Sequence, residues 1–349
     1  MSTDRAAPAQ RPLRSQRSLR LASGTALCLA TSFGLDLPIP MIAPVFCAFL
    51  LTMLNQPLAL KAGLGLALIA MLTTGSGLML TPLLRYYPFS GVLLVGLCLF
   101  LTFRLGLRGG NNLVVLFLAV GLTMISAAGT ASFALGVLVI GALVKGLLLA
   151  VLMHTISHGL FPEPAGAPSA PAATVLPYNE ASWMALRATV VVLPAFLLTL
   201  TDPASYMPII MKAVSLGRQS CTTTARGAAR ELLGSTLLGG VLAILFWFAL
   251  SLFVHLWMFF LWMLLFGLLL ARKLYALNPT RYPPSFWLNT FVTLIILLGQ
   301  SVQDSVAGKD VYTAFAVRMG LFIAVSLYAC LVLQLLDQPR RVLRQSGAI

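Results

Sequence analysis

Charged residues are scarce in this 349-residue chain, and acidic residues are scarcer still. Only 9% of the residues are charged and only 9 are Asp or Glu, whereas 59% are apolar and the mean hydropathy is +0.94. A water-soluble domain of this length needs more charge to cover its surface, so the composition excludes that class. Apolar runs fill almost the whole chain, which predicts an all-α polytopic membrane protein.

Cysteine and histidine are also few, with 5 and 3 residues. The number of cysteines is odd and their spacing contains no C-x-x-C, so we expect neither a disulfide framework nor a metal site. His154 and His158 are spaced to share one helical face, but no acidic or cysteine ligand lies nearby in the sequence. The stretch "SVAGKD" lacks the first glycine and the Ser or Thr of a P-loop. We therefore expect no cofactor.

Twelve apolar segments, bounded by Pro, Gly, Asn or charge, are predicted to span the membrane. They lie at residues 19–36, 38–54, 60–84, 87–107, 111–128, 131–153, 183–201, 203–217, 228–254, 256–276, 284–301 and 311–336. The basic N-terminal stretch resembles the charged region of a signal peptide. Because no convincing small-x-small cleavage site follows it, we interpret the first segment as a retained span.

Basic residues are distributed unequally between the predicted turns. With the N-terminus in the cytoplasm, only Arg85 and Lys309 lie on the opposite side. This asymmetry predicts that both termini are cytoplasmic, and it accounts for most of the +14 net charge without a nucleic acid partner. Arg20 and Arg187 fall at the cytoplasmic ends of their spans, where we expect their side chains to reach the lipid headgroups.

A connection rich in Pro and Ala divides the chain into two halves of six spans each. The predicted parts are a basic tail (1–18), a first six-helix repeat (19–155), a linker (156–182), a second six-helix repeat (183–337) and a basic tail (338–349). Similar residues recur at an offset of about 166 to 173: Leu19-Arg20 with Leu186-Arg187, Asp36 with Asp202, Met41 with Met207, Lys61 and Gly65 with Arg230 and Gly234, Arg104 with Arg272, Thr123 with Thr293, and Lys145 with Arg318. Six spans per unit predict parallel repeats, related by an axis along the membrane normal.

Proline interrupts the second and eighth spans, which occupy corresponding positions in the two halves. Short, interrupted segments of this kind indicate a transport site, because freed backbone groups are tolerated at membrane depth only beside protein or a water-filled cavity. The sixth and twelfth spans each carry a cation before a glycine. We expect a substrate site between the halves, near these four spans. Its candidate residues are Lys145, Arg318, Lys212, Pro44, Pro208, Met41 and Met207.

Each of these residues also has a structural alternative. The three cations would either line the pathway or pair within the bundle. Asp36 and Asp202 lie at external turns, where helix capping and proton coupling are both open. Glu231 follows a basic residue near the start of the ninth span, which favours an ion pair but leaves a coupling role open.

The two halves share a loose sequence pattern. A basic residue opens the first span ("SLRLASGTALCLA", "MALRATVVVLPAF"), and a proline-containing second span follows ("LPIPMIAPVFCAFLL", "PASYMPIIMKAVSL"); the third is basic with glycines ("RGAARELLGSTLLGGVLA"). This pattern resembles the fusaric acid resistance and aromatic acid exporter proteins. The length looks like that of a compact branch of bacterial inner-membrane proteins, without the large cytoplasmic domain of longer relatives.

The resemblance implies an inner-membrane efflux transporter for small organic anions, often aromatic carboxylates. It also implies a periplasmic membrane-fusion adaptor and an outer-membrane channel as partners, and it leaves a homo-oligomer open. Cations in an apolar bundle agree with a carboxylate substrate. Export would draw on the proton gradient or on the membrane potential. A passive anion channel is the main alternative, and a membrane-embedded enzyme acting on lipid is a weaker one.

Overall fold

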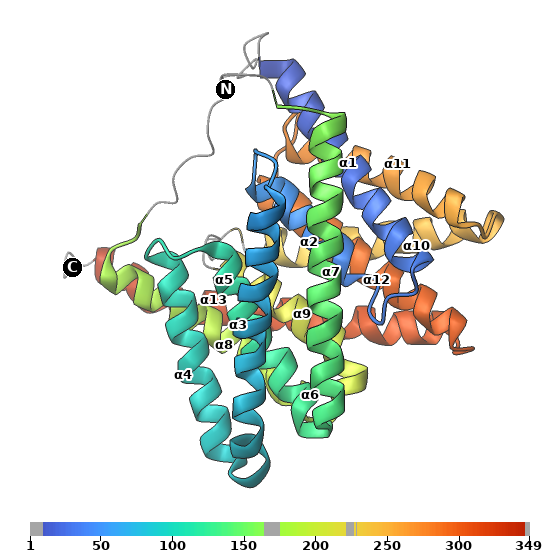
Figure 1. Ribbon diagram of the computed structural model, residues 1–349. Helices are drawn as coiled ribbons and strands as arrows, with labels where there is room; N and C mark the ends of the chain where they lie inside the picture. The colour runs from blue at the N-terminus through green and yellow to red at the C-terminus, as the bar shows by residue number, and fades with distance from the viewer. Residues whose placement is uncertain (1–9, 164–174, 221–226, 228, 346–349) are drawn as a thin grey trace. The chain divides into compact units, whose positions relative to one another are not determined.

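The computed structural model describes residues 10–163, 175–220, 227 and 229–345, and every regular element in these ranges is a helix. Figure 1 labels the α-helices, which are α1 (Gln10–Gly34), α2 (Ile42–Met53), α3 (Leu60–Tyr86), α4 (Pro88–Leu107), α5 (Asn112–Val120), α6 (Ser126–Ala131), α7 (Phe133–Leu160), α8 (Tyr178–Thr201), α9 (Pro203–Ser220), α10 (Gly234–Leu252), α11 (Leu256–Leu274), α12 (Pro284–Val306) and α13 (Val311–Gln345). Two π-helical segments, η1 (Gly121–Ile125) and η2 (Ala229–Leu233), directly precede α6 and α10. Among the described residues, nine helical segments are long and apolar enough to cross a membrane. The chain is therefore a multi-pass membrane protein.

These nine helical segments coincide with nine of the twelve predicted spans. The other three predicted spans correspond to α1, α2 and α9. α2 has only 12 residues, or about 18 Å at 1.5 Å per residue, whereas a hydrocarbon core is about 30 Å thick. Pro38 and Pro40 explain this short helix, because they hold the backbone irregular until Ile42. α1 and α9 are long enough, but basic side chains lower their hydropathy.

Several helices begin where local chemistry favours a start. Pro88 and Pro284 occupy the first residue of α4 and α12, where a missing N–H costs no hydrogen bond. The side chain of Asn111 accepts a 2.9 Å hydrogen bond from the Leu113 N–H at the start of α5. These caps and prolines place the helix starts close to the predicted ones.

The chain divides into two compact units, each built from segments of both halves of the sequence. Unit 1 comprises Met1–Ala67, Ala142–Pro171 and Leu238–Val311, and unit 2 comprises Leu68–Gly141, Ala172–Leu237 and Tyr312–Ile349. Unit 1 contains α1, α2, α11, α12 and most of α7 and α10. Unit 2 contains α4, α5, η1, α6, α8, α9, η2, α13 and most of α3.

In unit 1, α1 packs along α11 and against α2, and α12 packs against α11 and α2. Glycines allow close helix approach at two of the contacts. A Cβ atom added to Gly267 of α11 would lie 3.4 Å from the Ala22 Cα of α1. A Cβ atom added to Gly239 of α10 would lie 2.9 Å from the Thr290 carbonyl oxygen of α12. α12 is the most deeply buried candidate span that lies in this unit.

In unit 2, α8 packs along α9 and α4, and α5 with η1 packs against both α4 and α9. α13 joins this group through the Tyr328 hydroxyl, which donates a 3.2 Å hydrogen bond to the Val190 carbonyl of α8. Leu333 of α13 belongs to one buried apolar cluster with Val191 of α8 and Leu216 of α9. Burial of such side chains contributes roughly 1.5–3 kcal/mol each when water is the reference.

In unit 2, the π-helical turn η1 joins α5 to α6 and approaches α3 closely through backbone atoms. A Cβ atom added to Gly77 of α3 would lie 1.9 Å from the Gly121 carbonyl oxygen of η1. A Cβ atom added to Gly121 would in turn lie 2.6 Å from the Thr73 carbonyl oxygen. Only glycine at both positions permits this approach, and π-turns of this kind occur frequently at functional sites.

Candidate functional site

The predicted site residues of the second span lie at the irregular start of α2, within unit 1. Met41 and Pro44 are both buried. The Gln300 side chain of α12 approaches Met41, with 3.1 Å between its Nε2 and the methionine sulfur. A Cβ atom added to Gly299 would lie 2.7 Å from the Met41 Cβ, so the absence of a side chain there admits Met41 against α12. Within unit 1, the interrupted span of the first half therefore contacts the fifth span of the second half.

Lys145 lies on α7, next to the glycine that contacts α2. A Cβ atom added to Gly146 would lie 2.9 Å from the Ile42 side chain and 3.3 Å from the Ala43 nitrogen. The Lys145 side chain itself is exposed in unit 1. The predicted juxtaposition of the sixth span with the interrupted second span is thus present at Gly146, whereas the cation points away from the interior of this unit.

The remaining predicted site residues lie in unit 2. Lys212 of α9 is fully buried, Pro208 is buried and Met207 is partly buried. Arg318 of α13 is partly buried. Lys212 is therefore the most deeply buried of the three predicted site cations.

The acidic candidates occupy three different settings. Asp202 caps α9, because its Oδ1 accepts a 3.3 Å hydrogen bond from the Ser205 N–H. Asp36 is exposed and has a φ of +50°, a left-handed conformation that aspartate tolerates and that ends α1. Glu231 is partly buried in η2. Asp202 thus caps a helix, and a coupling role for the three acidic residues stays a prediction.

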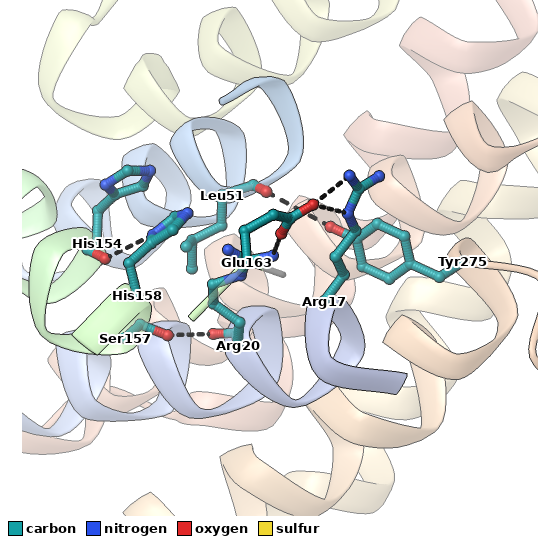
Figure 2. Close-up of polar contacts among 8 residues, drawn as sticks. All are labelled: Arg17, Arg20, Leu51, His154, Ser157, His158, Glu163 and Tyr275. Carbon is teal, nitrogen blue, oxygen red and sulfur yellow. Dashed lines mark hydrogen bonds and ion pairs between the residues drawn. The ribbon is translucent and has the colours of Figure 1, made fainter. Parts of the chain in front are cut away.

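A polar cluster that the sequence did not predict lies in unit 1, where α1 meets the end of α7 (Figure 2). Glu163, three residues after the end of α7, places its carboxylate between two guanidinium groups of α1. The Arg17 Nε donates a 2.8 Å hydrogen bond to Oε1, and the Arg17 Nη2 contacts the same oxygen. The Arg20 Nη2 donates to the other oxygen, Oε2. We call Arg17, Arg20 and Glu163 the arginine clamp.

The arginine clamp corrects one expectation for Arg20. Its side chain is only 3% exposed, so it is directed into unit 1 instead of reaching lipid headgroups. The prediction failed because Glu163 lies 143 residues away in the sequence. Glu163 also falls in the predicted linker, of which residues 164–174 lie outside the described residues.

Histidine, serine and tyrosine side chains surround the arginine clamp. The Ser157 hydroxyl donates a 2.7 Å hydrogen bond to the Arg20 carbonyl, which ties α7 to α1. The His154 and His158 rings share one face of α7, as predicted, with centroids 4.3 Å apart. Both rings are buried, and neither nitrogen of His154 makes a hydrogen bond of regular geometry. The described residues contain no group of three or more His, Cys, Asp or Glu that could hold a metal ion.

Charge and burial act on the groups of the cluster that lie outside the apolar helices. Burial alone would raise the pKa of the Glu163 carboxyl, but the hydrogen bonds and charges of Arg17 and Arg20 outweigh it and lower that pKa below its usual value. Burial raises the pKa of the Tyr275 hydroxyl to about 12, against the opposing charges of the two arginines. Glu163 is therefore ionised at neutral pH, and the Tyr275 hydroxyl stays protonated as a donor to the Leu51 carbonyl, 3.4 Å away.

Comparison with known proteins gives one match. The family described as "Protein of unknown function (DUF2955)" matches residues 17–157. This stretch resembles that family from Arg17 to Ser157, and it almost coincides with the first predicted repeat at residues 19–155. No curated protein and no solved structure matches the chain.

Proposed function

We propose that the chain is an inner-membrane efflux transporter for small organic anions, with aromatic carboxylates as the principal class. This assignment extends the sequence resemblance to the fusaric acid resistance and aromatic acid exporter proteins. The observation that carries it is the packing of each proline-containing second span against the fifth span of the other half. Parallel repeats and interrupted spans at corresponding positions are recurring features of secondary transporters.

The unit boundaries support an internal duplication. Unit 1 gives way to unit 2 after Ala67 and after Val311, and unit 2 gives way to unit 1 after Gly141 and after Leu237. Ala67 and Leu237 are 170 residues apart, and so are Gly141 and Val311. This spacing lies within the range of 166 to 173 over which similar residues recur. Each of these boundaries between the units is therefore matched, 170 residues away in the sequence, by a boundary of the opposite order.

The helix contacts inside the two units support the same duplication. In unit 1, α1 packs on α11 and α2, and α2 packs on α12. In unit 2, the equivalent α8 packs on α4 and α9, and α9 packs on α5 and η1. Each unit combines the first two spans of one half with the fourth and fifth spans of the other. In secondary transporters, substrate sites lie near the bilayer midplane at the interface of such repeats.

Cations in and beside the interrupted spans favour an anionic substrate. Lys212 is fully buried in α9, and Lys145 precedes the glycine of α7 that contacts α2. A cation already held in a desolvated place offsets part of the cost of moving a carboxylate out of water. We propose that Lys145 attracts the carboxylate in unit 1, where Met41 and Pro44 line its route, and that Lys212 and Arg318 attract it in unit 2, where Met207 and Pro208 line it.

The proposal includes an orientation and partners. Both termini lie in the cytoplasm of a bacterial cell, following the asymmetry of basic residues. A periplasmic membrane-fusion adaptor and an outer-membrane channel continue the route. Reporter fusions after Gly129 and after Ala307 are expected to report a periplasmic position, and a fusion after Ser169 a cytoplasmic one. A periplasmic result at Ser169 would exclude this orientation.

Transport of radiolabelled benzoate into proteoliposomes tests the proposed function. Purified full-length protein should give benzoate flux above that of empty vesicles, and Lys212→Met should reduce the flux. Lys309→Met is the control, since Lys309 lies in an external turn outside the proposed pathway. Absence of flux in every imposed pH gradient and membrane potential would refute the transporter assignment. Flux that simply follows the benzoate gradient and ignores an imposed pH gradient would identify a passive anion channel.

Cysteine labelling tests the position of the pathway. Single cysteines at Met41, Pro44, Met207 and Pro208, in a background without the native five, should react with small aqueous thiol reagents. Benzoate should protect them, because these positions are proposed to line the route of the carboxylate. Four unreactive positions would exclude a water-accessible pathway beside the interrupted spans.

A further inference from the structure

The arginine clamp has the chemistry of a carboxylate-binding site that is already filled. Two guanidinium groups hold both oxygens of one carboxylate, and this multidentate geometry is the one by which proteins recognise organic acids. The carboxylate belongs to Glu163, which lies just beyond the last residue of α7. Its position makes it a tethered ligand of two arginines that belong to a different helix.

The clamp also keeps unused capacity for an anion. Two guanidinium charges face one carboxylate, which leaves an excess of one positive charge in the clamp. The Arg20 Nη1 is buried without a hydrogen-bond partner. Leaving a buried donor unsatisfied is unfavourable. This donor provides a site for an oxygen that the Glu163 side chain does not supply.

From this geometry we propose that Arg17 and Arg20 bind the carboxylate of an organic acid, and that Glu163 occupies this site until the acid displaces it. The inference rests on the proposed function, since it assigns the cargo of the transporter to a second, separate site. Exchange of one carboxylate for another leaves neither guanidinium unpaired. Breaking the clamp without a replacement would leave the charge of Arg20 buried and uncompensated, which is strongly unfavourable.

The tether determines the concentration at which exchange occurs. An intramolecular ligand on a short connection has an effective concentration on the order of mM. An organic acid must therefore accumulate to about that concentration before it competes with Glu163. Tyr275 lies beside Arg17 in Figure 2, so an aromatic acid finds a ring to pack against once its carboxylate is bound. The clamp would thus make the protein respond to high internal acid and ignore trace amounts.

Removal of the internal carboxylate is the direct test. Glu163→Gln should lower the benzoate concentration for half-maximal flux about tenfold in proteoliposomes, because the competitor no longer carries charge. Glu163→Asp shortens the side chain by one methylene while keeping the charge, so it should give a smaller decrease. Arg20→Gln should raise the half-maximal concentration at least tenfold. Arg11→Gln, which removes the same charge from an exposed position of α1, should leave it unchanged.

The outcomes separate this inference from the proposed function. If the wild-type protein transports benzoate and Glu163→Gln leaves the half-maximal concentration unchanged or raises it, the clamp is structural and the inference is wrong. If Glu163→Gln does not fold, Glu163→Asp decides by the same criterion. If the wild-type protein binds benzoate without transporting it, the benzoate affinity of both proteins is measured by calorimetry. Glu163→Gln should then bind benzoate more tightly than the wild type, and equal or weaker binding would refute the inference. If the wild-type protein neither carries nor binds benzoate, the proposed function and the inference both fail.

Discussion

Adding one methyl group to α3 tests the backbone contact between α3 and the π-turn η1. Gly75 and Gly77 lie one half-turn apart on the same helix, and both can be changed to alanine. A Cβ atom at Gly75 would meet nothing within 4 Å, whereas a Cβ atom at Gly77 would lie 1.9 Å from the Gly121 carbonyl oxygen. The two variants therefore share a chemical change and differ only in the space that receives it.

The two substitutions are expected to change the free energy of unfolding in opposite directions. Alanine in a helix interior is favoured over glycine by up to about 1 kcal/mol, so Gly75→Ala should stabilise the protein by roughly 0.5–1 kcal/mol. At Gly77 the same gain opposes a clash of more than 1 Å, since carbon to carbonyl oxygen contacts normally lie at about 3.3–3.6 Å. Overpacking costs about 1–3 kcal/mol. The backbone of η1 cannot rotate away as a side chain could, so we expect a cost near the upper end of this range. The free energies of unfolding of the two variants should then differ by about 2–3 kcal/mol.

Thermal unfolding in one detergent measures this difference. At about 2 °C per kcal/mol for a chain of this size, Gly77→Ala should unfold about 4–6 °C below Gly75→Ala. Both proteins must be purified at the same detergent and lipid content, so that bound lipid does not contribute to the difference. Equal unfolding temperatures, or a more stable Gly77→Ala protein, would refute the close approach of α3 and η1.

Three further predictions follow from the two units. Gly239→Ala should destabilise the protein by about 1–2 kcal/mol relative to Gly141→Ala in the same thermal assay, because only Gly239 meets a backbone carbonyl; equal stabilities would refute the close approach of α10 and α12. The Lys145→Met and Arg318→Met proteins should each be as abundant as the wild type, but both should fail to give resistance to aromatic acids. Lys145→Arg should keep substantial resistance. Normal resistance in both methionine variants would exclude these cations from the pathway. The pKa of Glu163 is lower in the folded protein, so the ionised carboxylate should stabilise the fold fully above its ordinary pKa of about 4.5 and lose this effect as the pH falls through the folded value. The wild type should therefore unfold at a higher temperature than Glu163→Gln at neutral pH, and this difference should disappear by about pH 3. A difference that stays constant with pH would contradict the ion pair.

Hydropathy sufficed to predict the helical class and nine spans, because lipid requires each span to satisfy its own backbone groups. Hydropathy overestimated the length of the second helix, which was predicted at residues 38–54 and begins only at Ile42. Pro38 and Pro40 were recognised as interruptions, but only the structure places the first helical residue at Ile42. The face shared by His154 and His158 followed from their spacing of four residues, which is local information.

Contacts between distant segments could not be predicted in the same way. The partner of Arg20 is a carboxylate 143 residues away, and nothing in the local pattern distinguishes it from an arginine that reaches the headgroups. The residue pairs at a constant offset predicted two similar halves, but similarity alone does not determine whether a span packs within its own half or with the other. The packing of α1 on α11 and of α8 on α4 depends on side-chain complementarity between those helices.

The exchange of helices between the two halves has a consequence for synthesis. α1 ends at Gly34, and its partner α11 begins at Leu256, so the ribosome adds more than 200 residues between them. At about 5–20 residues per second, α1 waits roughly 10–45 s in the membrane before α11 exists. During that time the face of α1 that will contact α11 is covered only by lipid or by the insertion machinery. A ribosome that stalls after the first half therefore leaves helices whose partner helices are never synthesised. Membrane proteases should degrade such truncated chains rapidly.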